Sequence, residues 1–118
     1  MSQWRIREGV EFEIMMDDVE FQEKYEKAFR NMGESEKALQ KVGSMSEITR
    51  GYCQMFYKLY DDIFGEGSGE KIFEGKMNVT LCNKVYDSFI EHCQAESKRI
   101  LSETQKMANR YKPKKGKR

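Results

Sequence analysis

Residues 46–64, SEITRGYCQMFYKLYDDIF, decide the fold. Their apolar side chains recur every three or four positions, which is the spacing of one helix face. They form two adjoining stripes: Ile48, Tyr52, Met55, Phe56, Leu59 and Ile63 in one, and Cys53, Tyr57, Tyr60 and Phe64 in the other. So wide an apolar arc requires burial on two sides, and we therefore predict that this helix is the central element of the core. Aromatic stripes can also line cofactor sites, but core packing is by far the commoner reason for this spacing.

Both ends of this helix carry recognisable capping signals. Ser44 is a favoured N-cap residue, and Glu47 follows it at the spacing of a capping box. At the other end, Gly65 stands where a C-terminal capping glycine belongs. A short helical turn over residues 69–73 should follow, with Ser68 as its cap and Gly75 as its end. We expect its residues Ile72 and Phe73 to anchor it in the core.

This glycine-rich stretch ends in Gly75-Lys76, which raises the possibility of a phosphate-binding loop. Such a loop requires Gly, four residues, and then Gly-Lys-Ser/Thr. Residue 70 is Glu70 and residue 77 is Met77, so both the first glycine and the hydroxyl are missing. A dinucleotide fingerprint starting at Gly65 also needs glycine at position 70. We predict a packing corner that binds no nucleotide.

The N-terminal region alternates between apolar and charged residues. This alternation over about residues 4–15 predicts two strands with a turn at Glu8-Gly9. A helix from about Val19 to about Asn31 should follow, with Asp17 or Asp18 as its N-cap. Gly33 is expected to weaken or end that helix, before a more polar continuation.

The last helix is predicted to start at Asn78 or Thr80 and to run to about Tyr111, before Pro113. Its apolar stripe is dense up to Cys93 and sparse after Leu101. We therefore expect the end of this helix to project from the body.

These elements predict an α+β protein that is mostly α-helical, with an N-terminal β-hairpin packed on a bundle of three to four helices. Residues 1–111 should form a single domain, with the hairpin at about 4–15, and residues 112–118 a basic disordered tail. Six of the 21 Lys and Arg residues, and none of the 20 acidic ones, lie in residues 109–118. The rest of the chain is therefore net acidic.

Composition indicates a cytoplasmic protein. Charged residues make up 35% of the chain, and no window approaches the apolar length of a membrane span. The N-terminus lacks the apolar segment of a secretion signal. The three cysteines form no Cys-x-x-Cys pair, which is typical of a reducing compartment.

No group of residues in the sequence points to catalysis. His92 and Cys93 could form a nucleophilic pair, but neighbours on a helix point about 100° apart. A surface histidine beside a core cysteine is the simpler interpretation. A zinc site would need Cys53 as well as Cys82, together with His92 and Cys93. We predict that the protein is not an enzyme and has no catalytic residues, metal or cofactor.

Three stretches of the sequence resemble a family of small proteins from tailed phages and prophages of Gram-positive bacteria. They are GVEFEIMMDDVEFQEKYEKAF, FGEGSGEKIFEGKMNVTLCNKVYDSFIEHC and the basic end after MANRYK. Members of that family look like tail assembly chaperones, encoded between the tail tube and tape measure genes. The resemblance implies a non-catalytic chaperone in the bacterial host cytoplasm. It would keep the tape measure protein soluble and help tail tube protein to polymerise around it.

Such a chaperone needs exposed, adaptable apolar surface, which methionines can supply. Strand alternation requires that two of the consecutive residues Ile14, Met15 and Met16 face opposite sides. At least one of them should then point away from a single core, to be covered by another subunit or a client. Together with Met45 they form the predicted protein-binding surface, and we expect a homo-oligomer. Alternatively, helix 19–32 covers that face within one monomer, and the methionines simply fill the core.

A second functional class remains open at this point. The basic end, Arg110–Arg118, could make the chain a small nucleic-acid-associated phage or regulatory protein. Nucleic-acid-binding proteins more often carry their basic charge on a folded face, so we expect neither nucleic acid nor a membrane as partner.

Overall fold

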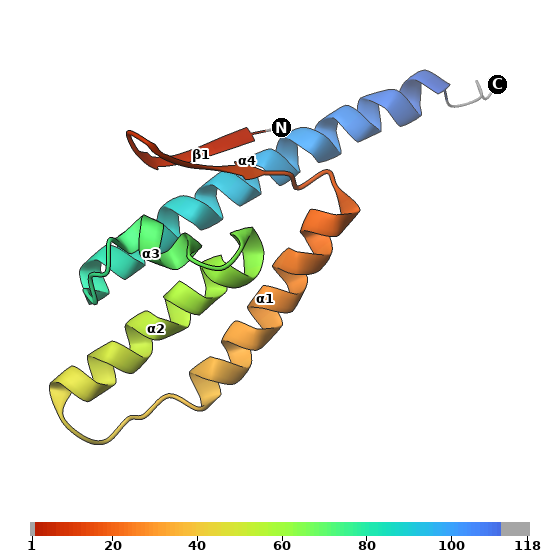
Figure 1. Ribbon diagram of the computed structural model, residues 1–118. Coiled ribbons are helices and arrows are strands. Elements are labelled where there is room, and N and C mark those ends of the chain that lie inside the picture. Colours follow the sequence, from red (N-terminus) through yellow and green to blue (C-terminus); the bar gives the residue numbers. More distant parts are fainter. Residues whose placement is uncertain (1, 112–118) are drawn as a thin grey trace.

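The computed structural model describes residues 2–111 as a two-stranded antiparallel hairpin followed by four helices (Figure 1). The strands are β1 (Ser2–Arg7) and β2 (Val10–Ile14). The helices are α1 (Val19–Lys37), α2 (Met45–Phe64), α3 (Ser68–Phe73) and α4 (Val79–Tyr111). The predicted class, a mostly helical α+β fold with an N-terminal hairpin, is confirmed. The predicted disordered tail, residues 112–118, lies outside the described residues.

Helix α2 is the centre of the core, as its sequence predicts. It packs against α1, α3 and α4, and six of its side chains are buried: Cys53, Met55, Phe56, Leu59, Tyr60 and Ile63. The predicted capping box starts this helix. Ser44 Oγ accepts a hydrogen bond from the Glu47 backbone N–H at 3.2 Å, and Glu47 Oε1 accepts one from the Ser44 backbone N–H at 3.0 Å.

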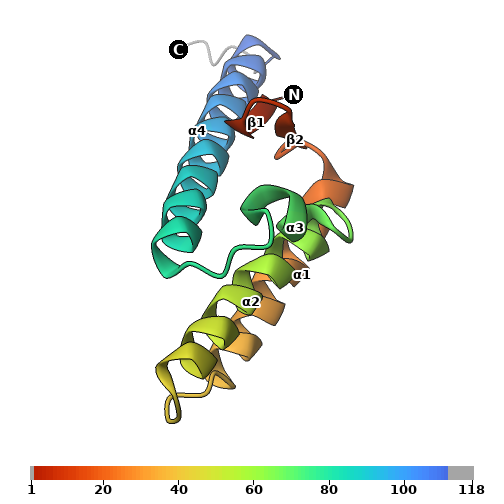
Figure 2. The same ribbon diagram turned by 60° about the vertical axis from the view of Figure 1, so that its left-hand side comes forward.

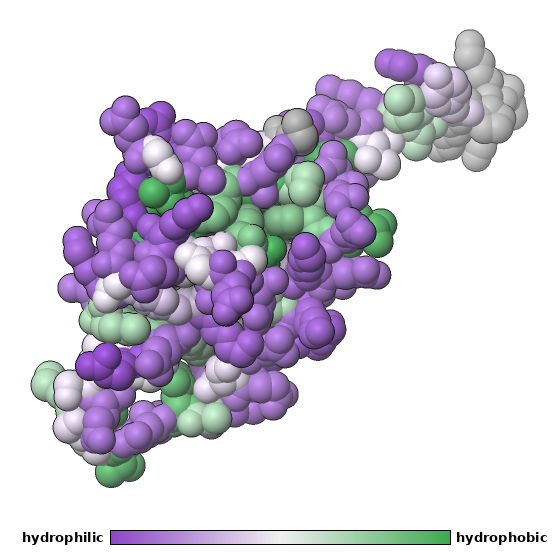
Figure 3. All heavy atoms as spheres, viewed as in Figure 1, coloured by the Kyte–Doolittle hydropathy of each residue, from purple (hydrophilic) through white to green (hydrophobic). Residues whose placement is uncertain are grey.

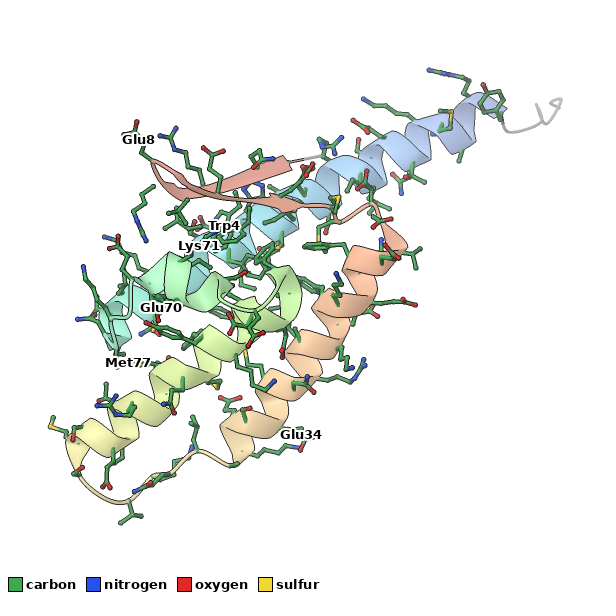
Figure 4. The ribbon with its side chains drawn as sticks, viewed as in Figure 1. Trp4, Glu8, Glu34, Glu70, Lys71 and Met77 are labelled. Atoms are coloured by element: carbon green, nitrogen blue, oxygen red, sulfur yellow. The ribbon has the colours of Figure 1, made fainter. Side chains whose placement is uncertain are left out.

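The hairpin is held on the helices by Trp4. This side chain is 2% exposed and lies between the hairpin and the helices (Figure 4). Its ring lies 5.0 Å from that of Phe89 in α4 and 5.7 Å from that of Tyr60 in α2. Its Nε1–H donates a hydrogen bond to Ser88 Oγ at 3.0 Å. One residue of β1 thereby joins the sheet to two helices, which supplies the support that an isolated two-stranded sheet lacks.

Arg7, at the other end of β1, bonds the hairpin to α3. Its guanidinium donates hydrogen bonds to the carbonyl oxygens of Lys71 and Ile72, at 2.6 and 3.0 Å. It also lies 3.5 Å from Glu74 Oε2. The last carbonyls of a helix have no partner within it, so Arg7 acts as a side-chain cap for α3.

The glycine-rich corner is a close contact between α3 and α2, and one predicted detail of it is wrong. Ser68 does not cap α3 but is buried as its first residue, and the N-cap is Gly67 in the left-handed region at φ 94°. A cap with this backbone conformation favours glycine over serine. Ile72 and Phe73 are fully buried, as predicted. Gly69 lies against the α2 backbone, since a Cβ there would stand 2.8 Å from Tyr57 Cα.

Helix α1 is longer than predicted, because Gly33 does not end it. The helix continues to Lys37, and Asp18 is its N-cap. Glycine costs a helix interior about 1 kcal/mol relative to alanine. Side chains along α1, among them Phe29 and Met32, pack against the core, and this packing outweighs that local preference.

Helix α4 makes the molecule elongated. Its first part carries the hairpin, and its last part extends beyond the rest of the chain (Figures 1 and 2). The radius of gyration is 18.5 Å, whereas a compact domain of this length would have one of about 13 Å. The prediction that the end of this helix projects is confirmed.

Candidate protein-binding surface

The projecting end of α4, residues 97–111, is called the arm here. Glu96 is the last buried residue of α4, and every residue of the arm is exposed except the half-buried Ile100. At 1.5 Å per residue, fifteen residues make the arm about 22 Å long. Free helices of this length are marginal in water, but the arm continues a helix already nucleated in the body.

Ion pairs join the base of the arm to the body. Arg99 Nε donates to Glu96 Oε1 at 2.7 Å, and Arg99 Nη1 donates to Glu103 Oε2 at 2.8 Å. The hydrogen bond from Arg99 is the main reason that the pKa of the Glu96 carboxyl lies below its usual value. These contacts at three- and four-residue spacing favour helix in the arm.

One side of the arm carries no charged side chain and is mostly apolar, and we call it the arm edge. It consists of Ser97, Ile100, Leu101, Thr104, Met107, Ala108 and Tyr111. Leu101 is 58% exposed, Met107 51% and Tyr111 73%. Lone exposed apolar side chains are ordinary, but these recur at helical spacing along one line. A line of this kind is what a second helix packs against.

Two open grooves lie along the arm edge, one at its base and one that extends to Tyr111. One, of about 570 Å³, is lined on its apolar side by Tyr25, Cys93 and Leu101. The other, of about 630 Å³, includes Ile100, Met107 and Tyr111, with Asp17 from the turn before α1. Burial raises the pKa of the Tyr25 phenol to about 12. In Figure 3 hydrophobic side chains gather where α4 leaves the body, among hydrophilic ones.

The structure separates the four residues of the predicted binding surface. Ile14 is 1% exposed and belongs to the core, so its assignment to an open surface is wrong. Met15 and Met16 are half-buried and pack against the core within this chain. Burial within one monomer, the alternative weighed from the sequence, therefore accounts for these three residues.

Met45 is 85% exposed at the start of α2, near the 82% exposed Val42. The start of α2 lies at the opposite end of α1 from the β2–α1 turn (Figure 1), and that turn contains Met16. Nineteen helical residues make α1 about 28 Å long, so Met16 and Met45 do not share one surface. Met55 fills the core at 6% exposure.

His92 and Cys93 do not form a reactive pair. Cys93 is 2% exposed, and burial raises the pKa of its thiol to about 12, so it stays protonated. The half-buried His92 contacts the hydroxyl of Ser2 through Nε2. Within residues 2–111, no hydrogen bond orients His92 through its other ring nitrogen, as a catalytic triad requires.

No three metal-ligating side chains converge among residues 2–111. No helix of that region is both long and apolar enough to cross a bilayer. The predictions that the protein is not an enzyme and has no cofactor stay predictions.

The chain matches the model of the "Family of unknown function (DUF6673)" over residues 8–118. It belongs to this family. No match was found among curated proteins or among solved structures. The DUF6673 match covers nearly the whole chain, including the arm and the glycine-rich corner.

The arm edge is the surface that sequence reasoning missed. The sequence indicated that apolar residues become sparse after Leu101, and this interpretation overlooked their positions. Ile100, Thr104, Met107 and Tyr111 follow one another at intervals of four, three and four residues. Counting these intervals would have revealed a helix edge suited to a partner helix.

Proposed function

We propose that this DUF6673 protein is a non-catalytic binding protein whose arm edge engages a helical segment of a long partner. More specifically, we propose a phage tail assembly chaperone that binds the tape measure protein and assists tail tube assembly. The observation that carries the proposal is the exposed apolar line on the arm, with Leu101, Met107 and Tyr111 each more than half exposed.

The chemistry of the arm edge suits an amphipathic helix as partner. Apolar side chains three and four residues apart match the side-chain spacing of a facing helix. Met107 and the neighbouring grooves tolerate different partner side chains, because methionine is flexible and repacks readily. The flanking charges, among them Lys98, Arg99 and Glu103, are of both signs, so they favour no strongly charged ligand.

The tape measure protein enters the proposal through the sequence resemblance. The segments that resemble tail assembly chaperones include residues 9–29 and 64–93, and a long helical client with apolar stripes is what that resemblance implies. Such a client exposes apolar surface until the tail tube surrounds it. Binding it reversibly along a helix edge would keep it soluble without any chemical step.

The proposal is tested by co-expression with a tape measure protein, the client that the sequence resemblance implies. We expect the wild-type chain to raise the soluble fraction of the tape measure protein and to co-purify with it. Leu101→Glu places a charge on the arm edge and should abolish both effects. Gln105→Glu adds the same charge to an exposed arm position off the edge, and should leave both unchanged.

Two outcomes would contradict the proposal. One is a tape measure protein that is equally insoluble with and without the wild-type chain. The other is a complex that Leu101→Glu leaves intact. Binding that instead weakens steeply with added salt would favour a phosphate-driven contact of the basic end with nucleic acid.

A further inference from the structure

The arm edge continues a stripe that begins inside the core. The stripe runs at alternating intervals of four and three residues through Tyr86, Ile90, Cys93, Ser97, Ile100, Thr104, Met107 and Tyr111. This is the heptad spacing of helices that pair side by side. The body covers its first three members, and Cys93 is 2% exposed. The same spacing then continues for about two heptads along the arm, where residues 2–111 leave every member of the stripe exposed except the half-buried Ile100.

Residues 112–118 are KPKKGKR and contain no large apolar side chain. We propose that a second copy of this chain covers the arm edge, with the two arms paired antiparallel. The inference rests on the same surface as the proposed function, and it concerns the protein without its client.

Heptad geometry defines the register of this pair. The stripe forms the seam of the pair, and its arm members fall into two sets, Ile100 and Met107 in one and Ser97, Thr104 and Tyr111 in the other. In an antiparallel pair, each member of one set faces a member of the other set on the second copy. Ile100 then faces Thr104 of the second copy, and Ser97 faces Met107 of the second copy. The next pair toward the body joins Cys93 and Tyr111 of the second copy. This places Tyr111 of the second copy at the groove that Cys93 lines together with Tyr25 and Leu101. The groove thereby gains an aromatic occupant.

The charges beside the seam favour the antiparallel orientation. In this register Arg110 of the second copy approaches Glu96, whose carboxylate is 8% exposed and already accepts a hydrogen bond from Arg99, and the two-fold symmetry repeats this approach. On the other side of the seam, Leu101 lies beside Leu101 of the second copy. Glu103 also approaches its equivalent, but Arg99 holds each of these carboxylates at 2.8 Å and offsets their repulsion.

A parallel pair lacks these advantages. It would place Glu96 beside Leu101 and Glu103 beside Ala108, with no opposite charges between the arms. It would also bring both copies of Arg110, and both of the basic sequences that follow, to the same end. Like charges brought together in this way select against that orientation.

The seam is short, so the dimer should be weak and dependent on concentration. Stable two-stranded coiled coils usually extend over three to four heptads, and the exposed stripe here has about two. A weak pair suits a surface that must later accept a client, because client and second copy would compete for the arm edge.

The first test is sedimentation equilibrium of the purified chain over a concentration series. We expect a monomer–dimer equilibrium for the wild type and for Gln105→Glu. Leu101→Glu should raise the dimer dissociation constant at least about tenfold, since burying two new carboxylates is unfavourable. Melting curves should show that both variants stay folded, because both positions are exposed. A wild type that is monomeric throughout, or a dimer that Leu101→Glu does not weaken, would overturn the inference.

The second test distinguishes the two orientations with a short thiol-reactive cross-linker. Leu101→Cys should cross-link efficiently, because Leu101 lies near its own equivalent in the antiparallel pair. Met107→Cys should not, because the two copies of residue 107 would be offset by about 15 Å along the helix axis. The wild type is the control, and its three cysteines are buried. Cross-linking through residue 107 in preference to residue 101 would refute the antiparallel pair.

These results are independent of the proposed function. A dimer disrupted by Leu101→Glu that never solubilises the tape measure protein would leave the inference intact and end the chaperone proposal. A strict monomer that binds the tape measure protein would refute the dimer and support the chaperone proposal.

Discussion

Replacing Gly69 with alanine should separate α3 from α2. The added Cβ would lie 2.8 Å from both Cα and the carbonyl oxygen of Tyr57. These are backbone atoms of α2, so they cannot turn aside as the end of a flexible side chain would. The backbone N–H of Gly69 donates a hydrogen bond to Asp61 Oδ1 at 2.8 Å, and this bond holds the corner in place.

The size of the effect follows from this contact. Carbon atoms in proteins approach to about 3.5 Å, so the two helices must move apart by roughly 0.7 Å. Such a shift loosens the packing of the fully buried Ile72 and Phe73. Overpacking of this kind lowers the free energy of unfolding by about 1–3 kcal/mol. Alanine also reduces the conformational entropy of the unfolded chain, which stabilises the folded state by less than about 1 kcal/mol. We expect a net loss of about 1–2 kcal/mol, or about 5–10 °C in melting temperature.

Urea titration and thermal melting followed by circular dichroism would measure this loss. Gly33→Ala is the matched control, since no atom lies within 4 Å of a Cβ built there. Gly33 is inside α1, so its replacement should stabilise the protein by about 0.5–1 kcal/mol. If Gly69→Ala is as harmless as Gly33→Ala, the corner is not the close packing contact described above.

Four further predictions test the core and the corner. Phe89→Ala and Phe56→Ala should each cost about 3–5 kcal/mol in chemical unfolding, because both rings are buried, and losses below about 1 kcal/mol would contradict the packing. Saturating ATP or GTP should leave the melting temperature unchanged, whereas a ligand at about 100 times its dissociation constant would add about 2.7 kcal/mol. Tyr60→Phe should keep or slightly raise stability, since the buried Tyr60 hydroxyl has no hydrogen-bond partner within residues 2–111, and a loss above about 1 kcal/mol would reveal one. Cys82 and Cys93 should react with a thiol reagent only after unfolding, because burial raises the pKa of each thiol to about 12, and rapid labelling of the folded protein would refute this.

Local signals in the sequence were enough to predict most of the fold. The capping box at Ser44, the turn at Glu8-Gly9 and the start of α4 near Asn78 each depend on residues close in sequence. Asn78 Oδ1 accepts a hydrogen bond from the Leu81 N–H, as a cap should. At α1, where the sequence misled, distant contacts decided the outcome. Gly33 stays helical because α1 packs along the core. At α3, by contrast, the sequence interpretation missed a local preference: Gly67 takes the left-handed cap, and Ser68 becomes the first helical residue.

The binding surface was harder to predict, because it depends on which side chains the fold leaves uncovered. Strand alternation indicated that part of Ile14–Met16 would be exposed, but the turn after β2 brings these residues back onto the core. Met45 is exposed, as predicted, but α1 separates it from Met16. The arm edge shows core-like spacing in the sequence, and only the fold reveals that the body ends at Glu96.

Hydrogen exchange with mass spectrometry on the DUF6673 protein, alone and with the tape measure protein, would test the central claim most directly. The chain should be diluted until it is monomeric, so that self-association does not protect the arm. Amides of residues 97–111 should then exchange faster than those of residues 79–96, because every residue of the arm except the half-buried Ile100 is exposed. Adding the tape measure protein should slow exchange in residues 97–111, and Leu101→Glu should remove that protection. Protection confined to the α1–α2 connection around Met45, or no protection at all, would contradict the claim that the arm edge is the binding surface.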